Sequence, residues 1–187
     1  MPTFVSHRLK LAFCHVPRTA GTSIAQWLLP FLGDDVEMDN LEKHEGFHSL
    51  SLGRLKKELE TYTKIAVVRN PLTWVPSMIG ISEQAPQAPD PDFWQSQTSY
   101  LCNADGELMA DVIFKFEYLP YCVIDFFKQF GVEGEFPHAN RGTKRNISLT
   151  AIDSVMNLYK EDFVNFGYGQ NLTYLPRIAA CLASSEP

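Results

Sequence analysis

Residues 9–32 read LKLAFCHVPRTAGTSIAQWLLPFL. The run at 9–16 is short, mostly apolar and stops at a proline, which predicts a buried strand rather than a helix. After a polar loop, Thr22 and Ser23 offer N-cap side chains to a densely apolar helix over 24–32. The order predicts a unit made of a strand, a tight loop and a helix.

The same order recurs further along the chain. A second strand, KIAVVR at 64–69, is followed by a helix that starts at a proline and covers 71–79. A third strand, DVIFKFE at 111–117, precedes a helix over 119–130, and an amphipathic pattern predicts a last helix over 149–166. This alternation predicts an α/β fold of three layers, in which helices flank a mainly parallel central sheet.

Length and composition favour one globular domain. The chain has 187 residues, of which 45% are hydrophobic, so we expect a single domain over 1–187. Pro86, Pro89 and Pro91 interrupt the segment 80–105, which we expect to be a long loop or lid on the acceptor side. A net charge of −6 excludes a global basic field for nucleic acid or an anionic membrane, so an anionic ligand must be bound locally.

Cysteine use and hydropathy favour a reduced, cytoplasmic protein. The four cysteines have no CxxC spacing, and the histidines do not fall in metal-ligand spacing, so we expect neither disulfides nor a metal. No apolar run has the length of a membrane helix, and the N-terminus lacks the order of a signal peptide. The sequence leaves the oligomeric state open.

The loop at 15–23, HVPRTAGTS, joins the first strand to the first helix. Gly21 permits close approach of the backbone, Thr22 and Ser23 supply hydroxyl groups, and the N-terminus of the helix favours negative charge. An ordinary capped turn would share these features, but Arg18 in the middle of the loop favours a phosphate cradle. The loop is not the standard one of nucleoside triphosphatases, because Thr22 rather than lysine follows Gly21.

These residues resemble the 5′-phosphosulfate-binding loop of the sulfotransferases, whose usual form is Pro-Lys-Thr-Gly/Ala-Gly-Thr-Ser/Thr. Arg69-Asn70-Pro71 closes the second strand, and Arg69 together with Ser77 is similar to the family's 3′-phosphate-binding element. The resemblance covers about residues 9–169, and the tail, with Tyr159–Phe163 and Phe166–Tyr168, looks like that of the carbohydrate-type members. It implies a P-loop-like fold and transfer of a sulfuryl group from 3′-phosphoadenosine-5′-phosphosulfate (PAPS), which leaves 3′,5′-adenosine bisphosphate (PAP), without a metal.

The resemblance also implies the residues that bind the donor. They are Arg18, Thr19, Ala20, Gly21, Thr22, Ser23, Arg69, Ser77, Arg141, Gly142 and Thr143. Arg18 is expected beside the bridging oxygen, where it would stabilise charge on the leaving phosphate. Two positions depart from the family: Arg18 replaces the usual lysine, and Trp74 replaces a second basic residue of the 3′-phosphate element. An arginine stabilises the leaving oxygen but does not readily give it a proton.

The acceptor hydroxyl must lose a proton, and His48 in the segment GFHSL is the candidate base. In 2-O-sulfotransferase-like members the base lies in a comparable place, although a surface or helix-capping histidine is the structural alternative. Glu45 and Glu83 are the reserve candidates, because other members use a carboxylate.

The acceptor is expected to be a small molecule or a saccharide. Phe93, Trp94 and Tyr100 could stack on a sugar ring, or they could pack on the core. Two other functions stay open: a small nucleotide-dependent phosphotransferase, and a nucleotide-binding protein of the same fold without turnover.

Overall fold

The computed structural model describes residues 3–33, 36–38, 46–47, 60–79, 95–103, 105–137 and 149–169. The strands are β1 (Phe4–Ser6), β2 (Leu11–Cys14), β3 (Val36–Met38), β4 (Thr63–Val68) and β5 (Val112–Lys115). The helices are α1 (Gly21–Leu32), α4 (Pro71–Ile79), α5 (Gln97–Leu101), η1 (Phe116–Tyr118, a 3-10 helix), α6 (Tyr121–Lys128), α7 (Leu149–Leu158) and α8 (Lys160–Asn165).

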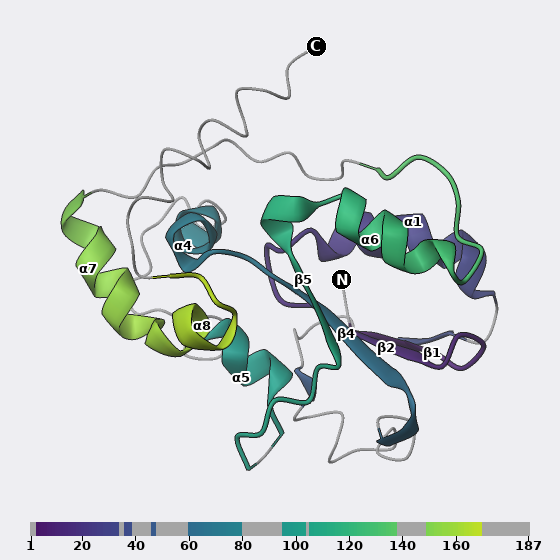
Figure 1. The fold of residues 1–187 in the computed structure, drawn as a ribbon, viewed down its shortest axis with the longest axis horizontal. Coiled ribbons are helices and arrows are strands. Elements are labelled where there is room, and N and C mark those ends of the chain that lie inside the picture. The colour runs from purple at the N-terminus through teal and green to yellow at the C-terminus, as the bar shows by residue number, and fades with distance from the viewer. Residues whose placement is uncertain are drawn as a thin grey trace.

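The five strands form one open sheet in the order β3-β1-β2-β4-β5 (Figure 1). The three predicted strands are confirmed as β2, β4 and β5, and they pair in parallel. β1 pairs antiparallel with both β2 and β3, so the sheet is mixed and the prediction of a mainly parallel sheet is not confirmed. Each of these two added strands has three residues, too few to show an alternating pattern in the sequence.

Two apolar clusters lie on opposite faces of the sheet. Leu11 and Phe13 of β2 belong to one cluster, and Ala12 and Cys14 belong to the other, because successive side chains of a strand point to opposite faces. Helices α1 and α6 pack on the first cluster, and α4, α5, α7 and α8 pack on the second (Figure 1). The prediction that helices flank the sheet is therefore confirmed.

Helix α1 begins three residues before its predicted start, at Gly21. Its N-cap is Ala20, and no side chain caps it, so the prediction that Thr22 and Ser23 supply the cap is wrong. The left-handed conformation of Ala20 turns the chain into the helix before these residues are reached. Both hydroxyl residues therefore lie inside the first turn.

The predicted last helix is two helices, α7 and α8, because Tyr159 leaves helical geometry between them. The aromatic residues of this tail pack in the core: Tyr159, Phe163, Phe166 and Tyr168 are all buried. Phe163 attaches α8 to the cluster on this face of the sheet, and Ile152 and Val155 attach α7.

Part of the expected lid is not a loop. Residues Gln97–Leu101 form helix α5, whose side chains are buried except for Ser99. Tyr100 belongs to the core, so the packing alternative holds for this aromatic residue. The other lid aromatics, Phe93 and Trp94, and the prolines of the segment lie outside the described residues.

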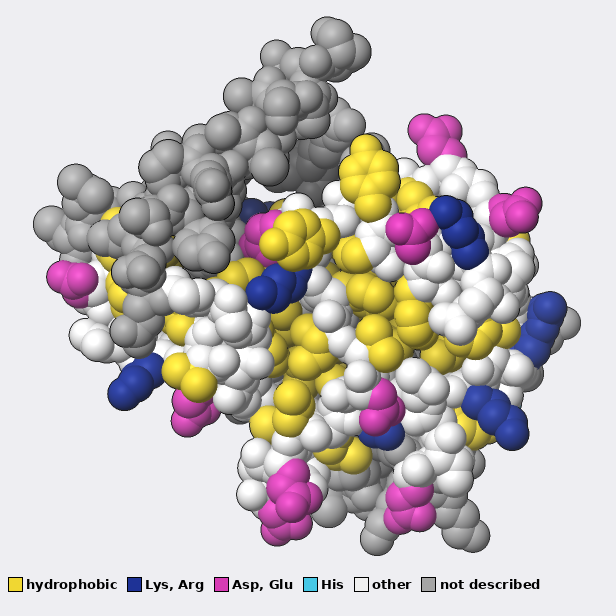
Figure 2. Space-filling view, in the orientation of Figure 1, with side chains coloured by type: hydrophobic (Ala, Val, Ile, Leu, Met, Phe, Trp, Pro, Cys, Tyr) yellow, Lys and Arg dark blue, Asp and Glu magenta, His cyan; other side chains and the backbone are white. Residues whose placement is uncertain are grey.

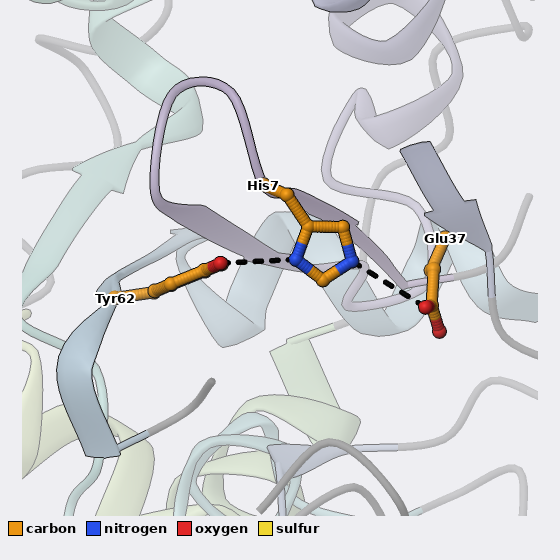
Figure 3. Close-up of polar contacts among 3 residues, drawn as sticks. All are labelled: His7, Glu37 and Tyr62. Atoms are coloured by element: carbon orange, nitrogen blue, oxygen red, sulfur yellow. Dashed lines mark hydrogen bonds and ion pairs between the residues drawn. The ribbon is translucent and has the colours of Figure 1, made fainter. Parts of the chain in front are cut away.

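Three side chains join the antiparallel half of the sheet to β4 (Figure 3). Nδ1 of His7, in the turn between β1 and β2, lies 2.9 Å from the hydroxyl of Tyr62, and Nε2 lies 3.4 Å from Oε1 of Glu37 in β3. Tyr62 directly precedes β4. The cluster therefore lies at the amino ends of β2 and β4, away from their carboxyl ends.

Within the described ranges, every helix is too short or too polar to cross a membrane. Cys14, Cys102 and Cys122 are free thiols, and burial raises the pKa of Cys14 to about 12.

We expect Phe127→Ala to lower the free energy of unfolding by about 3–5 kcal/mol, because it empties a wholly buried position. The Phe127 ring makes an edge contact with Trp27, at a centroid distance of 5.9 Å. Urea denaturation measures the change. Tyr121→Ala, at a position of the same helix that is 76% exposed, is the control and should change stability by less than about 0.5 kcal/mol. Equal losses in the two variants would contradict the assignment of α6 to the core.

Candidate functional site

The carboxyl ends of β2 and β4 place two polar loops side by side. These strands are parallel neighbours in which Cys14 pairs with Ala66, so the β2–α1 loop (residues 15–20) and the start of α4 leave the sheet at the same edge. Ligands of open α/β sheets bind beyond this edge. Of the residues expected to bind a donor, Arg18–Ser23, Arg69 and Ser77 lie at this edge.

The β2–α1 loop has a tightly curved backbone. Arg18 and Ala20 have φ angles of 61° and 68°, in the left-handed region that residues other than glycine seldom occupy. The hydroxyl of Thr19, a wholly buried residue, donates a hydrogen bond of 2.8 Å to the carbonyl of Val16. The Thr19 side chain therefore stabilises the loop from inside.

The N-terminus of α1 faces this loop without a capping side chain. The first intrahelical bond runs from the amide of Ile24 to the carbonyl of Ala20, at 3.1 Å. No side chain caps the helix, the amides of Gly21 and Thr22 precede this first bond, and the first turn holds no acidic residue. The positive end of the helix dipole is therefore available to an anion at this point.

Gly21 is required by packing inside the protein. A Cβ at this position would lie 1.9 Å from Cδ2 of His15, a side chain that is 5% exposed. We expected Gly21 to permit close approach of the backbone; the group that approaches is the imidazole of His15. Helix α1 can begin at Gly21 because this residue has no side chain that would collide with the imidazole of His15.

Two hydrogen bonds, each accepted by a main-chain carbonyl, join helix α4 to the β2–α1 loop. Nε1 of Trp74 donates to the carbonyl of Pro17 at 2.7 Å, and Nε of Arg18 donates to the carbonyl of Ser77 at 3.0 Å. Trp74 is wholly buried, and its ring makes an edge contact with Tyr159. Trp74, which departs from the family pattern, thus anchors the loop.

Arg69 extends from the end of β4 toward Arg18. Its Nη1 donates to the carbonyl of Arg18 at 3.3 Å, its Nε donates to the hydroxyl of Thr73 at 3.1 Å, and its guanidinium lies over the ring of Phe116, 4.2 Å from the centroid. Burial lowers the pKa of Arg69 to about 10; the Glu117 carboxylate opposes this shift, and the Arg18 guanidinium adds to it. Two cations are therefore held near each other, an arrangement that a bound anion would stabilise.

The carboxylate of Glu117, in η1 directly after β5, holds the chain between β4 and α4. It accepts hydrogen bonds from the amide of Asn70 at 2.8 Å and from the hydroxyl of Tyr168 at 2.9 Å. Burial raises the pKa of Tyr168, and the negative Glu117 raises it further, so the phenol keeps its proton. Asn70 in turn accepts from the amide of Leu72 and so caps α4.

The expected donor-binding residues fall into two groups. The structure brings together Arg18, Thr19, Ala20, Gly21, Thr22, Ser23, Arg69 and Ser77. The hydroxyl of Ser77 donates to the carbonyl of Trp74 at 2.6 Å, and Arg69 is bonded to Thr73 rather than to Ser77. The residues Arg141, Gly142, Thr143, His48, Glu45 and Glu83 lie outside the described ranges.

Sequence reasoning missed the parts played by Thr73, Gln97 and Asp162. The spacing of four residues between Arg69 and Thr73 was an available signal, because the chain turns into a helix at Pro71. For Gln97 and Asp162 the chain offered none, because their partners lie 28 and 65 residues away. Within the part of the chain that is described, no group of three or more His, Cys, Asp or Glu side chains could hold a metal ion.

We expect Gly21→Ala to lower the free energy of unfolding by about 1–3 kcal/mol, because the new methyl group overlaps His15. A double-mutant cycle with His15→Ala, measured by urea denaturation, tests the cause. In the His15→Ala background, the same substitution should cost less than about 1 kcal/mol. An unchanged cost there would show that something other than the imidazole requires the glycine.

Comparison with known proteins gives a match over the first part of the chain, which holds both arginines of this site. The model of the sulfotransferase family matches residues 1–73, a stretch that includes the β2–α1 loop, the N-terminus of α1, Arg69 and Thr73. No curated protein and no solved structure matches the chain. The mixed five-stranded sheet flanked by helices is consistent with a sulfotransferase fold. The match, which covers less than half of the 187 residues, shows that residues 1–73, with both arginines of the candidate site, are similar to the sulfotransferase family, and it supports sulfotransfer as the general activity.

Proposed function

We propose that this protein transfers a sulfuryl group from PAPS to the hydroxyl of a small-molecule or saccharide acceptor. The observation that carries the proposal is the placement of Arg18 and Arg69 beside the uncapped N-terminus of α1, within a segment that matches the sulfotransferase family. On the face drawn in Figure 2, the Lys and Arg side chains of the described residues lie scattered among Asp and Glu. A local pair of arginines is therefore what would bind an anion on this chain of net charge −6.

The described residues fit a ligand with two separated phosphate groups. The first turn of α1 and the Arg18 guanidinium suit the 5′ end, since the helix begins directly after the β2–α1 loop and the hydrogen bond from Arg18 to the carbonyl of Ser77 uses only its Nε. Arg69 suits the 3′-phosphate, because only its Nε and one N–H of Nη1 are used by the hydrogen bonds above. Arg141, Gly142 and Thr143 are proposed to complete this second subsite.

The donor supplies the sulfuryl group, and the chain stabilises the charge that remains behind. Arg18 and the amides of residues 19–23 are proposed to share the negative charge that develops on the leaving 5′-phosphate. Because an arginine keeps its proton, Arg18 acts through charge and hydrogen bonding, not as a general acid. Trp74 fills the place of a second basic residue with an indole that fastens the loop, so Arg69 and the 141–143 segment bear the 3′-phosphate.

The proton of the acceptor hydroxyl requires a base. We propose His48 for this task, with Glu45 and Glu83 as the alternatives, because imidazole titrates near neutral pH. His48 directly follows Phe47, a wholly buried member of the cluster that also contains Trp74.

We expect PAP to raise the melting temperature of the protein, whereas ATP with Mg²⁺ should leave it unchanged. Arg69→Ala should weaken PAP binding about 10- to 100-fold, because it removes a charge-assisted contact to phosphate. Isothermal titration measures the affinity. Arg8→Ala is the matched control, since Arg8 donates to the carbonyl of Phe31 at an exposed position outside the site.

Stabilisation by ATP with Mg²⁺ and not by PAP would overturn the proposal in favour of a phosphotransferase. Binding of PAP without transfer of labelled sulfuryl to any acceptor class would instead indicate a nucleotide-binding protein without turnover. The replacement of the family's lysine by Arg18 is the observation that gives this second function weight.

We expect His48→Ala to reduce sulfuryl transfer about 100- to 10,000-fold while PAP binding stays the same, because the variant removes the base and leaves the donor site intact. Transfer of labelled sulfuryl and titration with PAP measure the two effects. Glu45→Gln and Glu83→Gln are the parallel variants. Unchanged transfer in His48→Ala, with loss in one of the other two, would move the role of base to that carboxylate.

A further inference from the structure

We propose that Gln97 is a positioning residue for the donor site: it fixes the main chain of Arg69, and Asp162 fixes Gln97. The inference rests on the proposed function, because it assigns a task to Arg69. It links α5 and α8, which lie outside the residues matched to the family, to the arginine at the end of β4.

The side-chain amide of Gln97 forms hydrogen bonds with both main-chain polar groups of Arg69. The amide of Arg69 donates to Oε1 of Gln97 at 2.8 Å, and Nε2 of Gln97 donates to the carbonyl of Arg69 at 2.7 Å. Arg69 directly follows the last residue of β4. Within the strand, a neighbouring strand supplies the hydrogen bonds of the main chain; at Arg69 the side chain of Gln97 supplies them. The Arg69 peptide is therefore held although the sheet has ended.

Gln97 is wholly buried, which restricts its amide to this arrangement. A buried amide that left Arg69 would leave donors and acceptors without partners on both residues. The position of the Arg69 Cα is thereby set, and with it the point from which the guanidinium reaches the carbonyl of Arg18 and the ring of Phe116.

Asp162 of α8 holds Gln97 in turn. Its Oδ2 accepts from the amide of Gln97 at 2.9 Å, and its Oδ1 accepts from the amide and the hydroxyl of Thr98, both at 2.8 Å. Asp162 is wholly buried; burial raises the pKa of its carboxyl, while the bonds from Thr98 and Gln97 lower it. These bonds fix the first turn of α5 on α8.

The contacts form a continuous path from Asp162 through Gln97 to Arg69. Gln97 binds the main chain of Arg69 and leaves its guanidinium to the phosphate, so Gln97 acts through another residue. Loss of its side chain should therefore harm the contribution of the 3′-phosphate to binding more than it harms binding of the rest of the nucleotide.

The test compares PAP with adenosine 5′-monophosphate, which lacks the 3′-phosphate, by isothermal titration. Gln97→Met keeps the length of the side chain and removes both hydrogen bonds to Arg69. We expect it to reduce the ratio of the affinity for PAP to the affinity for adenosine 5′-monophosphate about tenfold. Thr98→Val is the control, because it removes one hydrogen bond to the same Asp162 without touching Arg69; its ratio should match that of the unmodified protein.

Asp162→Asn provides a second variant, in which the amide presents a donor where a main-chain N–H requires an acceptor. We expect it to lower the ratio in the same direction, by less than Gln97→Met does. An unchanged ratio in Gln97→Met, with PAP still bound by the unmodified protein, overturns the inference. Failure of the unmodified protein to bind PAP at all overturns the proposed function instead. The ratio does not depend on the folded fraction, so a lower melting temperature does not obscure the result.

Discussion

Two guanidinium groups are held close together at one edge of the sheet, although like charges repel. Hydrogen bonds to main-chain carbonyls fix them: Arg69 donates to the carbonyl of Arg18, and Arg18 donates to the carbonyl of Ser77. Burial and this proximity both lower the pKa of Arg69, with Glu117 acting in the opposite direction. An anion at this point would remove the repulsion and replace lost hydration. The remaining features of the site keep these two side chains in place.

Helix α4 contributes most to this arrangement. The indole of Trp74 donates a hydrogen bond to the carbonyl of Pro17. The hydroxyl of Thr73 accepts a hydrogen bond from Arg69, and the carbonyl of Ser77 accepts one from Arg18. The strained φ angles of Arg18 and Ala20 persist because these bonds, with the internal bond of Thr19, determine the path of the loop. One helix therefore sets the geometry of both arginines, and the residues of α5 and α8 fix the end of the strand from which α4 starts.

Sequence patterns predicted the parts that depend on local order. The apolar runs that end at polar residues predicted β2, β4 and β5, and Pro71 predicted the start of α4, because proline favours the first turn of a helix. The same patterns failed for β1 and β3, whose three residues are stabilised by pairing with distant strands. They also failed at the N-cap of α1, where Ala20 is left-handed and the loop before it is bonded at Pro17 and Arg18 to α4, more than 50 residues further along the chain.

The sequence by itself determined where charge and hydroxyl groups would follow the parallel strands, and so it identified Arg18 and Arg69 as candidates for one site. Only the tertiary structure decided that the imidazole of His15 fills the space of the missing Gly21 side chain, that Trp74 binds the loop, and that Gln97 completes the hydrogen bonds of Arg69. Individual strands and helices depend on residues that are neighbours along the chain, so a short stretch of sequence is enough to predict them. Each of the latter contacts depends on packing, and those of Trp74 and Gln97 join residues 57 and 28 positions apart, which no local pattern encodes.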